Sequence, residues 1–311
     1  MRHAMNELAR SSTPFLFIID YERAKPLLFP LPLQDDQVAF ALNAKGAPCP
    51  QRRLDFSPID FGHYSTQIAR IHEEIASGNV YLLNLTAKTP IQTNLTLEAI
   101  YTHAKARFKL YLKEQFVCFS PERFVSIGDD RIHTFPMKGT IDATLPDAKT
   151  TLLEDSKELA EHTMVVDLLR NDLGIIAHDI KVEAFRYVER IEHHQGAILQ
   201  TSSHISGALG HDWRERLGDL LFALLPAGSI SGTPKQSACR IITRLEGEER
   251  GYFCGVAGIF DGNNLESFVL IRFVEQCGKE LFYRSGGGIT LQSDATKEYE
   301  ELCKKIYFPF G

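Results

Sequence analysis

Short runs of aromatic and β-branched residues, bounded by glycine, proline or polar residues, dominate the hydrophobic pattern of this chain. Runs of this length and composition are typical of β-strands. Phe124–Ile127 and Arg131–Phe135 flank Gly128-Asp129-Asp130, a sequence that favours a β-hairpin. The other predicted strands are Phe15–Ile19, Val38–Leu42, Val80–Leu85, Phe116–Phe119, Lys181–Phe185, Ile198–Ile205, Val256–Phe260, Ser267–Phe273 and Glu280–Tyr283.

Helical periodicity appears in fewer segments. Tyr64–Ser77 carries isoleucines on one face and ends before Gly78. Many strands joined by hairpins, with helices inserted singly, predict an α+β fold on antiparallel sheets instead of a doubly wound parallel sheet. The other predicted helices are Thr150–Asp172, Trp213–Leu224, Pro234–Leu245 and Ala295–Lys305.

Composition narrows the class of protein. The chain has 311 residues, 44% hydrophobic and 24% charged, which indicates a globular protein of one large domain or two ordinary ones, and no linker-like segment separates domains. A net charge of −6 without a basic tail disfavours nucleic acid or a membrane surface as partner. The six cysteines are scattered without a CxxC pair, which indicates reduced thiols in a cytoplasmic protein.

Two predicted helices each carry a pair of carboxylates three residues apart. The pairs are Glu158 with Glu161, and Glu298 with Glu301, and this spacing places both members of a pair on one helical face. Carboxylates from separate helices are suitable ligands for Mg²⁺. Either pair taken alone is more often simply a solvated helix face.

Two glycine-rich segments are candidate anion sites. In Pro226–Lys235, PAGSISGTPK, we expect Thr233 to cap a helix and Pro234 to take its first position. Backbone N–H groups at such a helix start bind anions. The run Gly286-Gly287-Gly288 follows Arg284, which can hold a carboxylate through two N–H groups. Each segment alone is more often a turn, but both together with the acidic pairs indicate a polyanionic small molecule bridged by a metal.

Lys138 is a candidate nucleophile. Pro136 and Gly139 break the strand around it, and the predicted hairpin places Glu122 almost opposite across the two strands. A surface ion pair of small energetic value is one explanation. A lysine kept partly neutral, with Glu122 as general acid and base, is the other. Spacing alone leaves both open.

Several motifs together resemble those of the chorismate-utilising enzymes, which include anthranilate synthase component I, aminodeoxychorismate synthase component I, isochorismate synthase and salicylate synthase. The resemblance covers about Tyr64 to the C-terminus. The motifs are SPERF (120–124), PMKGT (136–140), KELAEHTMVVDLLRND (157–172), PAGSISGTPK (226–235), RGYFCGVAG (250–258) and RSGGGITLQSDATKEYEEL (284–302).

The resemblance implies an anthranilate synthase component I-like fold: a single α+β domain of two large antiparallel β-sheets packed together, with helices outside. It implies Mg²⁺ held at Glu161 and Glu301 with Glu158 and Glu298 beside them, and Glu122 as general acid. The positions that match the substrate site are Gly139, Thr140, Gln200, Ser231, Gly232, Thr233, Tyr252, Arg284, Gly286, Gly287, Gly288 and Lys305.

Lysine before Gly-Thr, here Lys138, is typical of the aminodeoxychorismate synthases, whereas anthranilate synthases carry alanine there. The resemblance therefore implies attack of Lys138 on C2 of chorismate, followed by addition of ammonia at C4 to give 4-amino-4-deoxychorismate for 4-aminobenzoate and folate. Ammonia would come from a separate glutaminase subunit. Anthranilate synthase is the first alternative, isochorismate or salicylate synthase the second, and a non-catalytic chorismate-binding relative the third.

Two features depart from the family pattern. Leu82 stands where isochorismate and salicylate synthases carry a lysine and the amino-transferring members carry glutamine. Residues 1–60 correspond to a reduced N-terminal portion, so regulation by tryptophan is not expected. Neither a glutaminase nor a lyase domain is expected in this chain.

Overall fold

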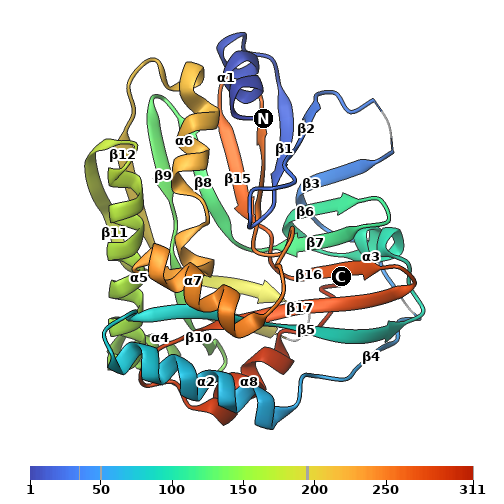
Figure 1. Cartoon of the computed structure of the whole chain (residues 1–311), viewed down its shortest axis with the longest axis vertical. Coiled ribbons are helices and arrows are strands. Elements are labelled where there is room, and N and C mark those ends of the chain that lie inside the picture. Colours follow the sequence, from blue (N-terminus) through green and yellow to red (C-terminus); the bar gives the residue numbers. More distant parts are fainter. Residues whose placement is uncertain (35, 50, 194–195, 311) are drawn as a thin grey trace. The chain divides into compact units, whose positions relative to one another are not determined.

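The computed structural model describes residues 1–34, 36–49, 51–193 and 196–310. Within these ranges the strands form two antiparallel sheets accompanied by helices (Figure 1). This confirms the predicted α+β class on antiparallel sheets. No helix in the described ranges is both long enough and apolar enough to cross a membrane.

The first sheet includes the predicted hairpin. Its strand order is β10-β12-β9-β8-β15-β14-β1-β2, and β11 also pairs with β12. In the hairpin, Ser126 pairs with His133, and Asp129 and Asp130 form the turn with positive φ angles. The strands are β1 (Phe15–Ile19), β2 (Leu27–Pro30), β8 (Arg123–Gly128), β9 (Arg131–Thr134), β10 (Met137–Asp142), β11 (His178–His193), β12 (Gly196–Ala208), β14 (Val256–Phe260) and β15 (Leu265–Val269).

The second sheet has the order β13-β5-β17-β16-β7-β6-β3, and β4 pairs with β5. The predicted strand Ser267–Phe273 is wrong as one element, because its ends belong to β15 and β16 in different sheets. The strands are β3 (Val38–Ala44), β4 (Leu54–Phe56), β5 (Leu82–Thr93), β6 (Ala106–Leu112), β7 (Phe116–Ser120), β13 (Gly232–Thr233), β16 (Phe273–Cys277) and β17 (Glu280–Ile289).

Each predicted helix corresponds to helical structure, but Thr150–Asp172 and Trp213–Leu224 are each divided in two, and α1 and α3 were not predicted. The single helix predicted over Thr150–Asp172 is two, because Asp155 adopts an extended conformation and caps the second helix by accepting from the Glu158 N–H. The elements are α1 (Arg2–Arg10), α2 (Phe61–Ala76), α3 (Leu97–His103), α4 (Ala148–Glu154), α5 (Ser156–Gly174), α6 (Leu217–Leu224), α7 (Lys235–Glu246), α8 (Ala295–Lys304) and the 3₁₀ turns η1 (Trp213–Arg216) and η2 (Gly228–Ile230).

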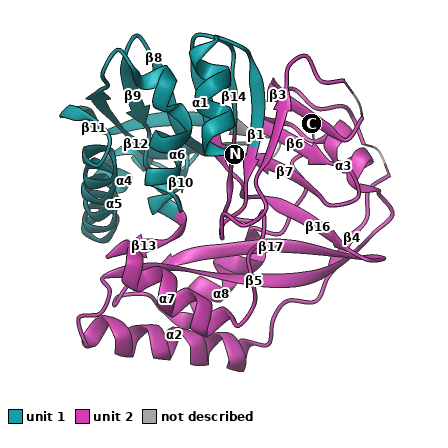
Figure 2. Cartoon of the chain, turned by 45° about the horizontal axis from the view of Figure 1, so that its top comes forward, with its two compact units in different colours: residues 1–17, 123–229, 258–267 teal, residues 18–122, 230–257, 268–311 magenta. Residues whose placement is uncertain are grey.

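The chain divides into two compact units, which are described separately (Figure 2). Unit 1 comprises Met1–Phe17, Arg123–Ser229 and Gly258–Ser267, and unit 2 comprises Ile18–Glu122, Ile230–Ala257 and Phe268–Gly311. The single domain expected from the sequence stays a prediction.

Each unit places helices against one face of its sheet. In unit 1, α4 and α5 pack on β10 and β12. In unit 2, α2, α7 and α8 bury a core of aliphatic side chains against β5 and β17, including Ile68, Leu83, Ile242 and Ile289. The opposite face of β5 and β17 carries Leu82, Thr86, Gly286 and Gly288, because side chains alternate along a strand, whereas Gly287 lies on the helix-covered face.

Candidate active site

Lys138 of unit 1 lies on β10 and points toward α5. Its Nζ donates to Oε2 of Glu161 at 2.5 Å, and Lys157 Nζ lies 3.7 Å from the other oxygen of the same carboxylate. The Lys138 side chain is 28% exposed, whereas that of Glu161 is 9% exposed. The lysine and the predicted metal ligand therefore meet in a half-buried ion pair.

Gly139 and Glu158 complete this corner of unit 1. Gly139 has a φ of +73°, and a Cβ added to it would lie 3.0 Å from Oε2 of Glu158. Burial raises the pKa of the Glu158 carboxyl, and the positive charge of Lys138 opposes that shift. Glu158 is thus held over the backbone next to Lys138, at a position where only glycine leaves room for it.

His162 was not predicted as a site residue. It is fully buried, and its Nε2 lies 2.6 Å from the hydroxyl oxygen of Ser203 on β12. Burial, with Arg186 and Lys138 adding to it, lowers the pKa of His162 to about 4, so the ring is neutral at pH 7. This hydrogen bond joins α5 to β12 at the residue that follows Glu161. In the sequence, the position of His162 next to Glu161 was the signal that could have identified it as a site residue.

The hairpin does not place Glu122 opposite Lys138. Lys138 lies beyond the hairpin in β10, which pairs with β12, and Lys138 is the partner of Thr201 there. Pro136 separates β9 from β10, and in the sheet β12 and β9 lie between β10 and β8. The prediction from hairpin register is wrong, although the role of Glu122 implied by the resemblance is a separate expectation.

Thr140 and Gln200 lie on the other face of the first sheet from Lys138. The β10–β12 register shifts between Lys138 and Thr140, so Lys138 pairs with Thr201 but Thr140 pairs with Gln200. Adjacent residues on a strand point to opposite faces. Unit 1 therefore brings together Lys138, Gly139, Glu158 and Glu161, but not the two predicted substrate residues.

In unit 2 the glycine run of β17 lies beside β5. Gly286 pairs with Thr86, and a Cβ on Gly286 would lie 2.5 Å from the carbonyl oxygen of Leu85. The Leu82 side chain lies 3.7 Å from the Cβ position of Gly288. On the face that Leu82 occupies, β5 therefore packs closely over Gly286, whereas Gly288 has only the Leu82 side chain near it.

Ser231, Gly232 and Thr233 extend the second sheet. Gly232 pairs with Leu83 and Thr233 with Leu82, and the Ser231 carbonyl accepts from the Asn84 N–H at 2.8 Å. The predicted helix cap at Thr233 is wrong, because Thr233 is a strand residue and Pro234 occupies the cap position of α7.

Arg284 and Tyr252 already have polar partners within unit 2. The guanidinium of Arg284 donates to Glu275 at 3.0 Å and to Glu248 at 2.7 Å, and it is 4% exposed as a residue. The Tyr252 hydroxyl donates to the Lys25 carbonyl at 2.8 Å. Arg284 therefore sits in a network of carboxylates that motif reading did not predict.

The carboxylates of α8 lie against the glycine run. Lys305 Nζ donates to the Gly286 carbonyl at 2.7 Å and contacts Oε1 of Glu301 at 2.7 Å. Oε2 of Glu298 lies 3.6 Å from the Cβ position of Gly287. Unit 2 thus brings Glu298, Glu301, Lys305 and the glycine run to one place.

The donor chemistry of both corners fits a hard cation. Glu158 and Glu161 in unit 1, and Glu298 and Glu301 in unit 2, offer carboxylate oxygens, which Mg²⁺ prefers. Glu161 and Glu301 each contact a lysine, so positive charge is already favoured at these carboxylates. Among the described residues, no group of three or more potential ligands is gathered at one point.

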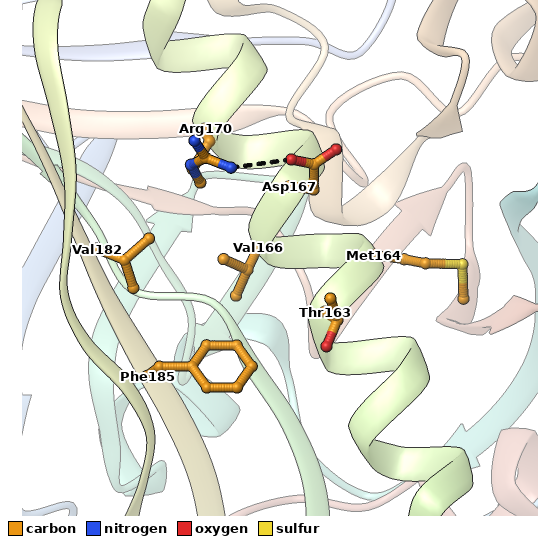
Figure 3. Close-up of a pocket in the computed structure, with 7 residues that line it drawn as sticks. All are labelled: Thr163, Met164, Val166, Asp167, Arg170, Val182 and Phe185. Atoms are coloured by element: carbon orange, nitrogen blue, oxygen red, sulfur yellow. Dashed lines mark hydrogen bonds and ion pairs between the residues drawn. The ribbon is translucent and has the colours of Figure 1, made fainter.

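One pocket of about 600 Å³ lies between α5 and β11. Figure 3 shows Val182 and Phe185 of β11 facing Val166 of α5, with the Arg170–Asp167 ion pair near them. None of the predicted site residues lines it. At 3.6 residues per turn, Thr163, Val166 and Arg170 point away from Glu161, whereas Met164 lies one turn after Glu161 on the same side of α5.

Comparison with known proteins gives one consistent result. Residues 34–310 match the family described as chorismate binding enzyme. The chain is 48% identical over 310 residues to an "Uncharacterized PabA-like protein" of Haemophilus influenzae, covering 98% of this chain and 94% of that protein. It is 30% identical to aminodeoxychorismate synthase component 1 of Bacillus subtilis, covering 81% of this chain and 55% of that protein. The chain thus spans about half the length of that synthase.

The similarities to solved structures extend to the fold. The structure of a protein from Bacillus anthracis, named as a 2,3-dihydroxybenzoate-specific isochorismate synthase, matches 98% of this chain over 85% of its own, with a TM-score of 0.74 and 20% identity. Anthranilate synthase component I from Streptococcus pneumoniae matches 81% of this chain and 58% of its own, with a TM-score of 0.69 and 27% identity. Family match, sequence relatives and fold agree, and the chain belongs to the chorismate binding enzymes of the anthranilate and aminodeoxychorismate synthase component I type.

Proposed function

We propose that this chain is an aminodeoxychorismate synthase component I, a Mg²⁺-dependent enzyme that converts chorismate and ammonia to 4-amino-4-deoxychorismate. The observation that carries the proposal is Lys138, half-buried on β10 with Nζ 2.5 Å from Glu161. A lysine at that position can act as a nucleophile once a fraction of it is neutral. Similarity to the Bacillus subtilis synthase supports the amino-transferring assignment.

Each residue has a defined task in the proposed reaction. The Lys138 amine forms a bond to C2 of chorismate, both ring double bonds shift (C1=C2 to C1=C6, and C5=C6 to C4=C5), and the C4–O bond breaks as Glu122 gives a proton to the leaving hydroxyl, releasing water. Ammonia then forms a bond to C4, both double bonds return to their first positions, and the C2–N bond to Lys138 breaks. Lys138 recovers its proton from the incoming ammonia through Glu122.

Substrate anchoring is assigned to unit 2 and metal binding to the acidic pairs. Arg284, Tyr252, Lys305 and the backbone of the glycine run would hold carboxylates. Mg²⁺, held by Glu161 and Glu301 with Glu158 and Glu298 beside them, would supply positive charge to a substrate carboxylate. Ammonia would come from a separate glutaminase subunit, and the enzyme would act in the cytoplasm on the route to 4-aminobenzoate and folate.

Anthranilate synthase component I is the second candidate, favoured by the similarity to the Streptococcus pneumoniae structure. A product assay separates the two. Purified protein is incubated with chorismate, Mg²⁺ and ammonium, with and without an added aminodeoxychorismate lyase, and the products are separated chromatographically. We expect 4-aminobenzoate only with the lyase present. Anthranilate or salicylate with the lyase, and no 4-aminobenzoate, would overturn the proposal.

Replacing Glu161 by glutamine is expected to weaken Mg²⁺ binding at least about tenfold, since an amide lacks the charge that a hard cation requires. Calorimetric titration of the protein with MgCl₂ measures the effect. Glu154→Gln, an exposed change of the same type on α4, is the control and should leave the affinity unchanged. Equal affinities in both variants would remove Glu161 from the metal site.

A further inference from the structure

Arg284 is held between two carboxylates of unequal accessibility. Its Nε donates to Oε1 of Glu275 at 3.0 Å, and its NH1 donates to Oε1 of Glu248 at 2.7 Å. The side chain of Glu275 is 15% exposed, whereas that of Glu248 is 42% exposed. The two carboxylates therefore differ in how readily they can leave the guanidinium for water.

Glu275 has a second cationic partner and Glu248 has none among the interactions that the structure describes. Lys88 Nζ, directly across from Arg284 on β5, lies 3.0 Å from the same Oε1 of Glu275. Glu248 sits in the short segment between α7 and Arg250, after Gly247 with its φ of +68°. The positive charges of Arg284 and Lys88 balance the negative charges of Glu275 and Glu248. An anionic ligand that reaches Arg284 must therefore displace one of the two carboxylates, and Glu248 is the one that can turn outward.

Arg284 also lies on one face of β17 with two residues of the glycine run. Gly286 and Gly288 follow it at alternate positions of β17, so all three share one face with Leu82 and Thr86 of β5. At Gly288 the nearest atom to an added Cβ is in the Leu82 side chain at 3.7 Å, so a ligand can approach the half-exposed backbone there. A carboxylate seated on this face would meet the Arg284 guanidinium, where the Glu248 carboxylate now lies.

We infer that Glu248 is an internal competitor for the substrate carboxylate, occupying its place on Arg284 until substrate arrives. Rotation of Glu248 into solvent then accompanies binding, and the carboxylate sets how tightly the site holds an anionic ring acid. The inference rests on the proposed function, because it takes chorismate as the ligand of Arg284. Glu248 is a residue that tunes affinity, not one that takes part in bond making.

The test compares Glu248→Gln with Glu249→Gln. Both remove one negative charge from adjacent exposed positions. The Glu249 side chain makes no described contact with Arg284, because the hydrogen bond between these two residues is to the backbone carbonyl of Glu249. Calorimetric titration with chorismate in the presence of Mg²⁺ gives Kd. We expect Kd to fall about two- to fivefold in Glu248→Gln, the range for a partly exposed ion pair, and to stay unchanged in Glu249→Gln.

Equal Kd values for Glu248→Gln, Glu249→Gln and the wild type would refute this inference while leaving the proposed function intact. Tighter binding in both variants to the same degree would also refute it, because general charge would then be the cause. Absence of chorismate binding by the folded wild type would refute the proposed function, and this inference with it. A Glu248→Ala variant, checked for an unchanged thermal unfolding midpoint, should tighten binding at least as much as Glu248→Gln.

Discussion

Replacing Lys138 by alanine is expected to lower the rate of 4-amino-4-deoxychorismate formation by at least about a thousandfold, because the nucleophile of the proposed reaction is removed. The side chain is 28% exposed and contacts Glu161 at 2.5 Å. Its removal leaves the Glu161 carboxylate with Lys157 at 3.7 Å, so the fold and the carboxylate should both persist. Steady-state assays coupled to an aminodeoxychorismate lyase measure the loss.

Lys138→Arg is the matched control, because arginine keeps the positive charge beside Glu161 but does not lose its proton at accessible pH. If Lys138 acts through its charge alone, the arginine variant should recover most of the activity. If it acts as a nucleophile, the arginine variant should stay as inactive as alanine. Mass spectrometry of the wild type with chorismate and Mg²⁺, without ammonium, should show a gain of one chorismate minus one water at Lys138. Full amination by Lys138→Ala would contradict the mechanism.

Local signals in the sequence were enough for most elements of the fold. The Gly-Asp-Asp turn between β8 and β9 predicted the hairpin, and isoleucine spacing with a following glycine predicted α2. Boundaries that depend on one residue's backbone were missed, as at Asp155, where a cap divides α4 from α5. The segment 267–273 reads as one apolar strand, yet its ends pair in different sheets, and strand partners are a tertiary property.

The candidate site was predictable where helical spacing or a motif defined it. Glu158 and Glu161 follow from an i, i+3 spacing, and Lys138 from its motif, so their proximity could be anticipated in part. Strand register could not be anticipated. One bulge at Gly139 turns Thr140 and Gln200 to the far face, and the pairing of β10 with β12 removes Glu122 from the position opposite Lys138. Such shifts invert every side chain beyond them.

Replacing Arg250 by methionine is expected to lower the free energy of unfolding by about 3–5 kcal/mol, the usual cost of leaving one member of a buried ion pair alone. The side chains of Arg250 and Glu246 are 1% and 4% exposed, and Arg250 NH2 lies 2.7 Å from Oε1 of Glu246. The guanidinium also donates to the Ile230 and Asn84 carbonyls at 2.9 Å and 2.8 Å. Methionine has a similar length but leaves the carboxylate and both carbonyls without these partners.

Urea denaturation of the wild type and Arg250→Met measures this effect, and Lys304→Met is the control. Lys304 and Glu300 form an ion pair of the same i, i+4 spacing, but their side chains are 77% and 59% exposed, so its loss should cost at most about 0.5 kcal/mol. Adding Glu246→Gln to Arg250→Met should recover part of the lost stability, because the uncompensated charge is gone. The Glu246 carboxylate also accepts from the N–H and hydroxyl of Thr86, whose strand neighbour is Gly286. Equal losses in Arg250→Met and Lys304→Met would show that burial does not make the Arg250–Glu246 ion pair more stabilising than an exposed one.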